Sequence, residues 1–476
     1  MRNNRLWHVM SLLAVTAFVV AACSPAATAT TAPTSAPVAT TAPAATVAPT
    51  TAAAATAAPT TAATVAPTTA AAATEAPTTA ATVAATAAAT AAATAAPPTI
   101  PDITAGKFNV AVVLVGFHAD GGWSQAHTEG AQWVAQQDAS IAVQYVELIN
   151  PGPDAESVMR QLARKGFDMI IGTTFEYGPT MDSLSAEFPK ISWLHVSGYR
   201  SNGTNYGNLF GAMEDMKYLS GMIAGARAKA DKSTKLGYVA PWPLPEVIRL
   251  GNAFMLGAKQ TCPECTMEVR WINTWYDPDK EKQAGQSLID AGVDVVLIGS
   301  DTPGPLVAAS NAGKWAIPYD YIGGCAPAAD KCLTVEYWNW GPVYLDIIKQ
   351  IKAGTWKPGN SYLDADSGIV GLYGFMTGQK PQPGVPADVI PLVQAKLADM
   401  LSGKFTRKDL FMGPIKDNTG KIIVPAGVSL TDEDLQGIDA ATITANNLTG
   451  RTGCTICMHW LADGIQGTIP AMPGSN

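Results

Sequence analysis

Short apolar runs alternate with amphipathic stretches from residue 106 onward, and this alternation limits the fold more than any other feature. "VAVVLV" (110–115) is followed by "SQAHTEGAQWVAQQ" (124–137), which has helical spacing, and the alternation continues. Strands that are apolar throughout and are separated by helices indicate parallel sheets covered on both faces. The pattern restarts at "KLGYVAPW" (235–242). We therefore predict an α/β protein with two Rossmann-like lobes, an N-terminal lobe over 106–230 and a C-terminal lobe over 231–334.

The remainder of the chain, 335–476, is predicted to be a crossover followed by a C-terminal extension. "CLTVEYWNW" (332–340) and "GPVYLDIIKQIKAG" (341–354) read as a strand and a helix that cross back, so the N-terminal lobe receives segments from this region.

The first residues have the features of an export signal. Arg2 and Arg5 precede an apolar stretch from Val9 to Ala22, which is too short for a confident membrane span. The stretch ends in "VAAC", which resembles a bacterial lipobox, so residues 1–23 are predicted to be a lipoprotein signal peptide with Cys23 as the lipid-bearing residue. An ordinary signal peptide cleaved near "AACSPA" is the alternative. We expect the protein on the extracytoplasmic face of the cell membrane, held by its lipid anchor.

Residues 24–105 are predicted to be a disordered linker rich in Ala, Thr and Pro. "ATVAPTTAAAAT" starts at Ala45 and again at Ala63, a period of 18 residues. The repeat lacks aromatic residues and any amphipathic pattern, so it cannot bury enough apolar surface to offset the entropy of the chain. Its composition is typical of an extended stalk, including stalks that carry O-linked glycans.

Composition excludes several classes of function. The formal net charge is −8 and Lys and Arg do not cluster, which argues against nucleic acid as a partner. There is no G-x-S-x-G elbow and no evident Cys–His arrangement, so we do not expect an enzyme. A glycosidase-like pair of carboxylates is the remote alternative.

Six of the seven cysteines form three close pairs, and an exported chain favours disulfides within each pair. A zinc site built from two CxxC pairs is the alternative. The pairs are Cys262 with Cys265, Cys325 with Cys332, and Cys454 with Cys457.

Aromatic and acidic residues follow most of the predicted strands. Ligands of open α/β sheets bind outside the carboxyl ends of the strands, so these residues are our candidates for ligand binding. Aromatic faces stack on a planar ring, and carboxylates accept hydrogen bonds from its N–H or O–H groups. We therefore predict a flat, neutral or weakly basic small molecule held between two closing lobes, with no cofactor. The candidates are Trp123, Phe175, Tyr177, Trp242, Trp275, Asp301, Asp320 and Trp340.

The stretch "GFHADGGWSQAH" (116–127) resembles a metal site at first sight. Its spacing is not that of a helical HExxH site and no fourth ligand is evident, so we predict no metal. Asp120 is placed to cap the following helix, and His127 is expected to pack. The pair Gly121–Gly122 is expected to let the backbone approach a ligand closely.

Several motifs together resemble the basic membrane protein (BMP) family, lipoprotein substrate-binding components of ABC importers. They include "DGGWSQAHTEG", "FEYGPTM", "GYVAPWPLPEVIRLGNAFMLGA" and "WNWGPVYLDIIKQIKAGTW", and the likeness runs from about Phe108 to Phe411. The resemblance implies a type I periplasmic-binding-protein fold with a ligand cleft between the lobes, a purine base or nucleoside as ligand, and a membrane-embedded ABC permease as partner.

The resemblance also bears on individual residues. Trp123 and Phe175 match ring-contacting segments of the family, and Asp301 and the region of Asp320 match polar contacts of the second lobe. "AMEDMKY" departs from the expected pattern, so Glu214 is not carried over as a contact. The same fold binding a sugar, or serving as a ligand-sensing receptor, remains the alternative.

Overall fold

The computed structural model describes residues 98–445 and 451–472, which belong to one compact unit of the chain. The predicted signal peptide, Cys23 and nearly all of the predicted linker lie outside the described residues. Within the described part of the chain, no helix combines the length and the apolar character that a membrane span requires.

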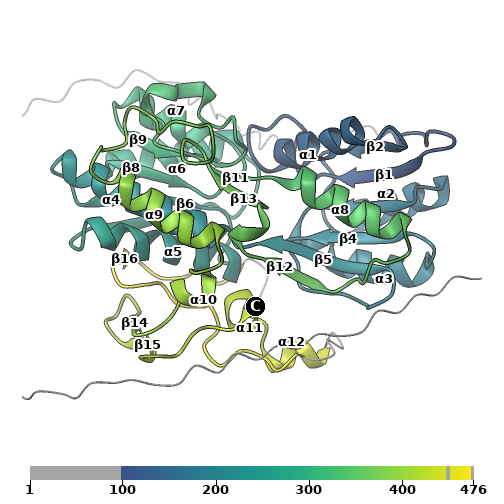
Figure 1. Cartoon of the computed structure of the whole chain (residues 1–476). Coiled ribbons are helices and arrows are strands. Elements are labelled where there is room, and N and C mark those ends of the chain that lie inside the picture. The colour runs from purple at the N-terminus through teal and green to yellow at the C-terminus, as the bar shows by residue number, and fades with distance from the viewer. Residues whose placement is uncertain (1–97, 446–450, 473–476) are drawn as a thin grey trace, which may run out of the picture. The chain divides into compact units, whose positions relative to one another are not determined.

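The first lobe is a six-stranded sheet in the order β12-β5-β4-β3-β1-β2, with every neighbouring pair parallel. In β1, Val110 and Val112 face one core whereas Ala111 and Val113 face another, as the period of two along a strand requires. Helices cover both faces, and the predicted parallel α/β architecture is confirmed (Figure 1). The strands are β1 (Phe108–Val113), β2 (Ile141–Val146), β3 (Met169–Gly172), β4 (Ser192–Val196), β5 (Tyr206–Gly211) and β12 (Asn360–Leu363); the helices are α1 (Trp123–Gln137), α2 (Pro153–Lys165), α3 (Gly178–Glu187) and α8 (Trp340–Lys352).

The second lobe is a five-stranded parallel sheet in the order β16-β7-β6-β8-β9. Its edge strand β16 comes from the far C-terminal end of the chain. The strands are β6 (Lys235–Ala240), β7 (Thr266–Trp271), β8 (Val295–Ile298), β9 (Trp315–Ile317) and β16 (Ile465–Gln466); the helices are α4 (Met213–Ala230), α5 (Pro245–Thr261), α6 (Pro278–Asp290) and α7 (Gly304–Asn311).

Helix α4 lies with the second sheet, although the sequence places residues 213–230 at the end of the first lobe. It packs along α5 so closely that a Cβ on Gly221 would lie 2.0 Å from the Phe254 carbonyl oxygen, and one on Gly257 would lie 1.9 Å from that of Tyr218. These glycines let the two backbones touch. The chain therefore first crosses between the lobes at Ala212, before α4.

The chain crosses again through a small sheet in the order β10-β11-β13, and the predicted crossover is present. Its strands are β10 (Tyr319–Asp320), β11 (Glu336–Trp338) and β13 (Val370–Leu372). The following helix α8 packs on α1, more than 200 residues earlier in the chain, and Figure 1 shows the two helices side by side.

Residues 402–445 and 451–472 form what we call the C-terminal segment, drawn in yellow in Figure 1. It joins the second lobe through β16 and through the contact of α11 with α5. It follows α9 (Ile390–Leu401), which packs on α4. Its elements are α10 (Arg407–Leu410), β14 (Ile415–Lys416), β15 (Ile422–Val424), α11 (Asp432–Gln436), α12 (Ala440–Ala445) and β16.

The six clustered cysteines form three disulfides, each within one near pair. Cys262–Cys265 follows the end of α5, Cys325–Cys332 brackets a short 3-10 helix, η2 (Ala326–Lys331), and Cys454–Cys457 lies in the C-terminal segment. The Cα–Cα separations are 5.3, 5.4 and 5.3 Å, within the usual range for a disulfide.

Candidate functional site

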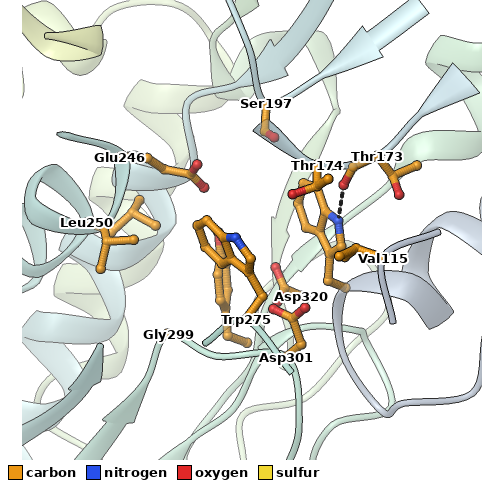
Figure 2. Close-up of a pocket in the computed structure, with 13 residues that line it drawn as sticks. Val115, Thr173, Thr174, Ser197, Glu246, Leu250, Trp275, Gly299, Asp301 and Asp320 are labelled. Atoms are coloured by element: carbon orange, nitrogen blue, oxygen red, sulfur yellow. Dashed lines mark hydrogen bonds between the residues drawn. The ribbon is translucent and has the colours of Figure 1, made fainter. Parts of the chain in front are cut away.

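A pocket lies between the two lobes, at the carboxyl ends of their strands, and its space of about 410 Å³ includes open solvent (Figure 2). We call it the central pocket. It combines aromatic, carboxyl and hydroxyl side chains, and neither Lys nor Arg is among the residues that line it. It is lined by Val115, Trp123, Thr173, Thr174 and Ser197 from the first lobe, by Glu246, Val247, Leu250, Trp275, Gly299 and Asp301 from the second, and by Tyr319 and Asp320 of β10.

Trp123 is the first residue of α1 and forms a fixed wall of the pocket. Its indole Nε1 donates a hydrogen bond to the Thr173 carbonyl oxygen at 2.5 Å. The ring also meets His127, Trp338 and Trp340 edge to face. Because these contacts hold the ring from several sides, Trp123 offers a pre-oriented apolar surface to a ligand.

Trp275 reaches the pocket from the loop after β7. Its indole Nε1 donates to Glu176 Oε1 of the first lobe at 2.7 Å, so this side chain both lines the pocket and joins the lobes. Figure 2 shows its ring in the middle of the pocket, between the carboxyl group of Glu246 and those of Asp301 and Asp320.

Asp301 and Asp320 place two buried carboxyl groups in the pocket, with exposed fractions of 4% and 1%. Trp338 Nε1 donates to Asp320 Oδ1 at 2.7 Å. The Oδ2 atoms of both residues have no hydrogen-bond partner among the described residues. Burial, followed by the neighbouring carboxyl groups, raises the pKa of Asp301 well above its ordinary value, and burial likewise raises that of Asp320. A pair of this kind that keeps a proton can both donate and accept a hydrogen bond.

Backbone geometry singles out two of the lining residues. Asp320 has φ +72° and Ser197 has φ +69°, in the left-handed region that residues other than glycine seldom adopt. Such strain is often found where a structure fixes a side chain for a ligand.

Glu246 lies in the first turn of α5, at another edge of the pocket. Burial raises its pKa to about 7, with the nearby Arg249 acting in the opposite direction. The Glu246 carboxyl group therefore changes charge near neutral pH.

The buried Glu281 anchors the loop that carries Asp301 by accepting hydrogen bonds from its neighbours. Its Oε2 accepts hydrogen bonds from the Ser300 hydroxyl at 2.8 Å, the Thr302 hydroxyl at 2.7 Å and the Thr302 backbone N–H at 2.9 Å. This anchoring fixes the position of Asp301.

The pair Gly121–Gly122 contacts this loop of the opposite lobe, whereas the sequence suggested that it approaches a ligand. A Cβ on Gly122 would lie 2.1 Å from the Asp301 carbonyl oxygen, and one on Gly121 would lie 2.8 Å from Pro303 Cδ. The glycines therefore allow the lobes to meet.

Asp120 caps α1 as expected, because its carboxylate accepts from the backbone N–H groups of Gly122, Ser124 and Gln125.

The central pocket brings together half of the residues that the sequence singled out: Trp123, Trp275, Asp301 and Asp320. Phe175 lines two neighbouring cavities instead.

The other three candidates do not line the central pocket. Tyr177 is fully buried in the core of the first lobe, where its hydroxyl donates to the Ile149 carbonyl oxygen at 2.5 Å. Trp340 is buried at the start of α8 and stacks on Trp338 and His127. Trp242 is half-buried. A position just after a strand does not fix the direction of a side chain, and none of these three lines the central pocket.

Sequence reasoning missed hydroxyl and acidic residues of the pocket. Thr173, Thr174 and Ser197 follow β3 and β4 directly, so the rule that located the tryptophans could have found them. Glu246 lies inside a helix, and no local signal marks it.

Among the described residues, no group of three or more His, Cys, Asp or Glu side chains is arranged to hold a metal ion. His118 pairs with Glu147 at 2.7 Å, and His127 Nδ1 lies 2.6 Å from the Tyr344 hydroxyl. Both histidines thus have structural partners.

Residues 107–390 match the family described as ABC transporter substrate-binding proteins, PnrA-like. The chain belongs to this family. The match covers more than half of the chain, and it makes the protein a substrate-binding component and not an enzyme.

Two curated relatives of this substrate-binding protein carry different ligand names. A putative ABC transporter glucose-binding protein of Haloferax volcanii is 34% identical over 261 residues, which cover 55% of this chain and 65% of that protein, just under two thirds of its length. A purine-binding protein of Brucella abortus is 31% identical over 338 residues, which cover 70% of this chain and 91% of that protein.

A crystal structure of an ABC transporter solute-binding protein from Aeropyrum pernix K1 has the same fold. It superimposes with a TM-score of 0.56 at 18% identity, covering 72% of this chain and 98% of that one. The predicted two-lobed periplasmic-binding architecture is thereby confirmed.

Proposed function

We propose that this protein binds a purine base or nucleoside between its two lobes and delivers it to an ABC permease in the membrane. The observation that carries the proposal is the central pocket itself. Two buried carboxyl groups, Asp301 and Asp320, lie there beside the indole of Trp275. A purine offers both a flat apolar face and an edge of ring nitrogens and N–H groups, and this combination suits such a pocket.

The charges that line the pocket favour a neutral or weakly basic ligand. A phosphate or free carboxylate would meet several acidic groups and no lysine or arginine in the lining. The unpartnered Oδ2 atoms of Asp301 and Asp320 need hydrogen-bond partners, and a ligand with donors and acceptors on one edge supplies them.

The lengths of the alignments with two relatives support a purine over a sugar as the ligand. The alignment with the purine-binding protein spans 338 residues, and the alignment with the glucose-binding protein spans 261. A sugar is the second candidate, because aromatic and carboxyl groups also bind pyranoses and because the glucose-binding relative is the more identical of the two.

A thermal-shift and calorimetric screen of the purified protein tests the proposal. The ligands are adenine, hypoxanthine, adenosine, glucose and a mixture of amino acids. A purine at 100 times its dissociation constant stabilises the protein by about 2.7 kcal/mol, which is readily detected. If glucose alone stabilises the protein, the ligand is a sugar and not a purine. If no ligand of the screen stabilises it, the proposed function is wrong. Uptake of labelled adenine by cells, with and without the protein, separates a transport component from a sensing receptor.

We also propose that a lipid on Cys23 holds the protein on the outer face of the cell membrane, with the Ala/Thr/Pro-rich residues 24–105 as a spacer. The lipobox-like "VAAC" and the short apolar stretch before it support this proposal. Replacing Cys23→Ser is expected to release the protein from the membrane fraction. Retention of that variant in the membrane would contradict the anchor.

A further inference from the structure

The C-terminal segment contacts both lobes, although the family match ends at residue 390. In the second lobe it supplies β16, which pairs with β7 as an edge strand of that sheet. Asn252 of α5 also donates to the Trp460 carbonyl oxygen at 2.8 Å and accepts from the Ala462 N–H at 2.8 Å. Because the segment is built into the second lobe, we expect it to move with that lobe.

In the first lobe the segment contacts one face of the edge strand β12. Asn360, Tyr362 and Asp364 alternate along extended backbone, so their side chains lie on the same face. Gln436 Oε1 accepts from Asn360 Nδ2 at 3.0 Å. The Arg407 guanidinium lies 4.3 Å from the centre of the Tyr362 ring and forms an ion pair with Asp364. Three successive positions on one face of β12 are thus held by the C-terminal segment.

Arg407 makes two of these three contacts. It is the first residue of α10, where the Asp409 carboxylate accepts from the Thr406 backbone N–H at 2.9 Å and fixes the start of the helix. Its side chain is buried, and Nη2 also donates to Asp432 Oδ1 of α11 at 2.9 Å. A buried guanidinium that loses one carboxylate partner keeps the cost of its burial, so the contact with Asp364 resists separation.

Asp364 lies where the chain returns from β12 of the first lobe to β13 and to α9, which both contact α4 of the second lobe. The next residue, Ala365, donates its backbone N–H to Asp215 Oδ2 at 3.4 Å, close to the first crossing at Ala212. Two crossings between the lobes therefore lie side by side. Hinges between domains consist of a few residues at such crossings, and Arg407 holds one of them.

We infer that the C-terminal segment is a strap that favours the closed arrangement of the lobes in the ligand-free protein, with Arg407 as the positioning residue that joins it to the first lobe. Since the segment belongs to the second lobe and holds β12 of the first, opening has to break the contacts of Arg407 and Gln436. The strap acts on the lobes and not on the ligand, so the inference does not depend on which molecule the central pocket binds.

Pulsed electron paramagnetic resonance on the full-length protein tests the inference. Spin labels on Asp154→Cys and Lys280→Cys report the distance between the lobes, because both residues are exposed and lie in the first turns of α2 and α6. Protein without the introduced cysteines gives the background signal. We expect one main, short distance without ligand. Asp364→Asn is expected to raise the fraction of molecules at a longer distance about tenfold, the effect of one hydrogen-bonded charged pair.

Two further variants separate a strap from an element that only stabilises the fold. Gln436→Leu removes the hydrogen bond to Asn360 and keeps the ion pair of Asp364, so it is also expected to increase the fraction at the longer distance. Glu433→Gln is the matched control, because Glu433 pairs with Arg451 inside the C-terminal segment. Its distance distribution is expected to equal that of the wild type.

The role of Arg407 is tested by combining substitutions. Arg407→Met and the double variant Arg407→Met with Asp364→Asn are expected to open equally, since both lack the same ion pair. A double variant that opens further would give Asp364 another partner and would remove Arg407 from the strap. With adenine as the probe, dissociation from Asp364→Asn is expected to be about tenfold faster than from the wild type.

Three results would overturn the strap. These are a ligand-free wild type that is mainly at the longer distance, wild-type distributions in both Asp364→Asn and Gln436→Leu, or equal opening in Glu433→Gln, which would indicate general damage to the C-terminal segment. Each of them leaves the proposed function intact. If no ligand of the screen binds the wild type, the proposed function fails, and the distances in the ligand-free protein still decide whether the strap exists.

Discussion

The indole Nε1 of Trp275 donates a hydrogen bond to Glu176 Oε1 at 2.7 Å, across the cleft between the lobes. Glu176 belongs to the short 3-10 helix η1 (Phe175–Tyr177) after β3, and Trp275 belongs to the loop after β7. The second carboxylate oxygen of Glu176 accepts from the Thr174 hydroxyl at 2.5 Å, which fixes the side chain. A pocket-lining residue of one lobe is thus bound directly to the other lobe, and the structure has the lobes in contact.

Removal of this contact is expected to favour the open arrangement of the lobes. Glu176→Ala leaves the Trp275 N–H without its partner, so we expect ligand affinity to fall about tenfold, the effect of one hydrogen bond to a charged group. The measurements are adenine titration and small-angle scattering, in which the ligand-free variant should have a larger radius of gyration. Glu187→Ala is the control, because Glu187 pairs with Arg160 inside the first lobe. Equal scattering curves for wild type and Glu176→Ala would contradict this role.

Trp123 is expected to contribute more to ligand binding than any other residue of α1, because it is the aromatic residue of that helix that lines the central pocket. Trp123→Leu removes the flat surface, and we expect at least tenfold weaker binding of adenine. Trp133→Leu is the matched control on the same helix, since Trp133 lines a different cavity. Similar losses in the two variants would indicate damage to the helix instead of loss of a ligand contact.

The sequence predicted the two sheets well because apolar runs and helical spacing are local signals. It missed β5, whose sequence "YGNLFG" has two glycines and an asparagine in place of an apolar run. It assigned α4 to the first lobe because order along the chain does not show on which sheet a helix packs. That assignment needs the close approach of α4 and α5, at Gly221 against Phe254 and at Gly257 against Tyr218, which is visible only in three dimensions.

The site was predicted in part for a similar reason. The ends of parallel strands gather at one edge, so Trp123, Trp275, Asp301 and Asp320 could be found from their positions after strands. The direction of a side chain after a strand depends on the loop, and Tyr177 turns into the core instead. Residues of the C-terminal segment that line a second cavity, beside Ser197 and Glu246, could not be found, because the fold brings them there from a distance.

Glu246 is expected to make the stability of the ligand-free protein depend on pH. Its carboxyl pKa rises from an ordinary value of 4.5 to about 7 in the fold, so the folded state binds the proton more tightly. The associated stability is complete below pH 4.5 and is lost as pH rises through about 7. Glu246→Gln should therefore reduce the fall in melting temperature between pH 5 and pH 8. Part of the fall will persist, because burial raises the pKa of Glu281 in the same way.

The control for this measurement is Glu264→Gln, which changes an exposed glutamate after α5. Its melting temperature should follow the wild-type curve at every pH. A Glu246→Gln curve that also follows the wild type would show that the Glu246 carboxyl group does not bind the proton more tightly in the folded state.

Asp301 is expected to lower the stability of the ligand-free protein while it binds the ligand. It is buried beside Asp320, and its Oδ2 has no partner among the described residues, so ionisation near pH 7 costs free energy. Asp301→Asn replaces the ionisable carboxyl group with an uncharged amide of nearly the same volume. At pH 7 we expect it to raise the free energy of unfolding by roughly 1 kcal/mol, a typical size for a single substitution, because the amide has no ionised form to bury. The same variant should bind adenine at least tenfold more weakly, because the carboxyl pair loses an oxygen that can partner the ligand. Denaturant unfolding and calorimetric titration measure the two effects. The control is Asp290→Asn, which changes an exposed aspartate.

If Asp301→Asn is less stable than the wild type, Asp301 holds the loop together. If its affinity for adenine is unchanged, the ligand does not contact Asp301. Gain of stability together with loss of binding is the result that separates a carboxyl group kept for a ligand from one kept for the fold.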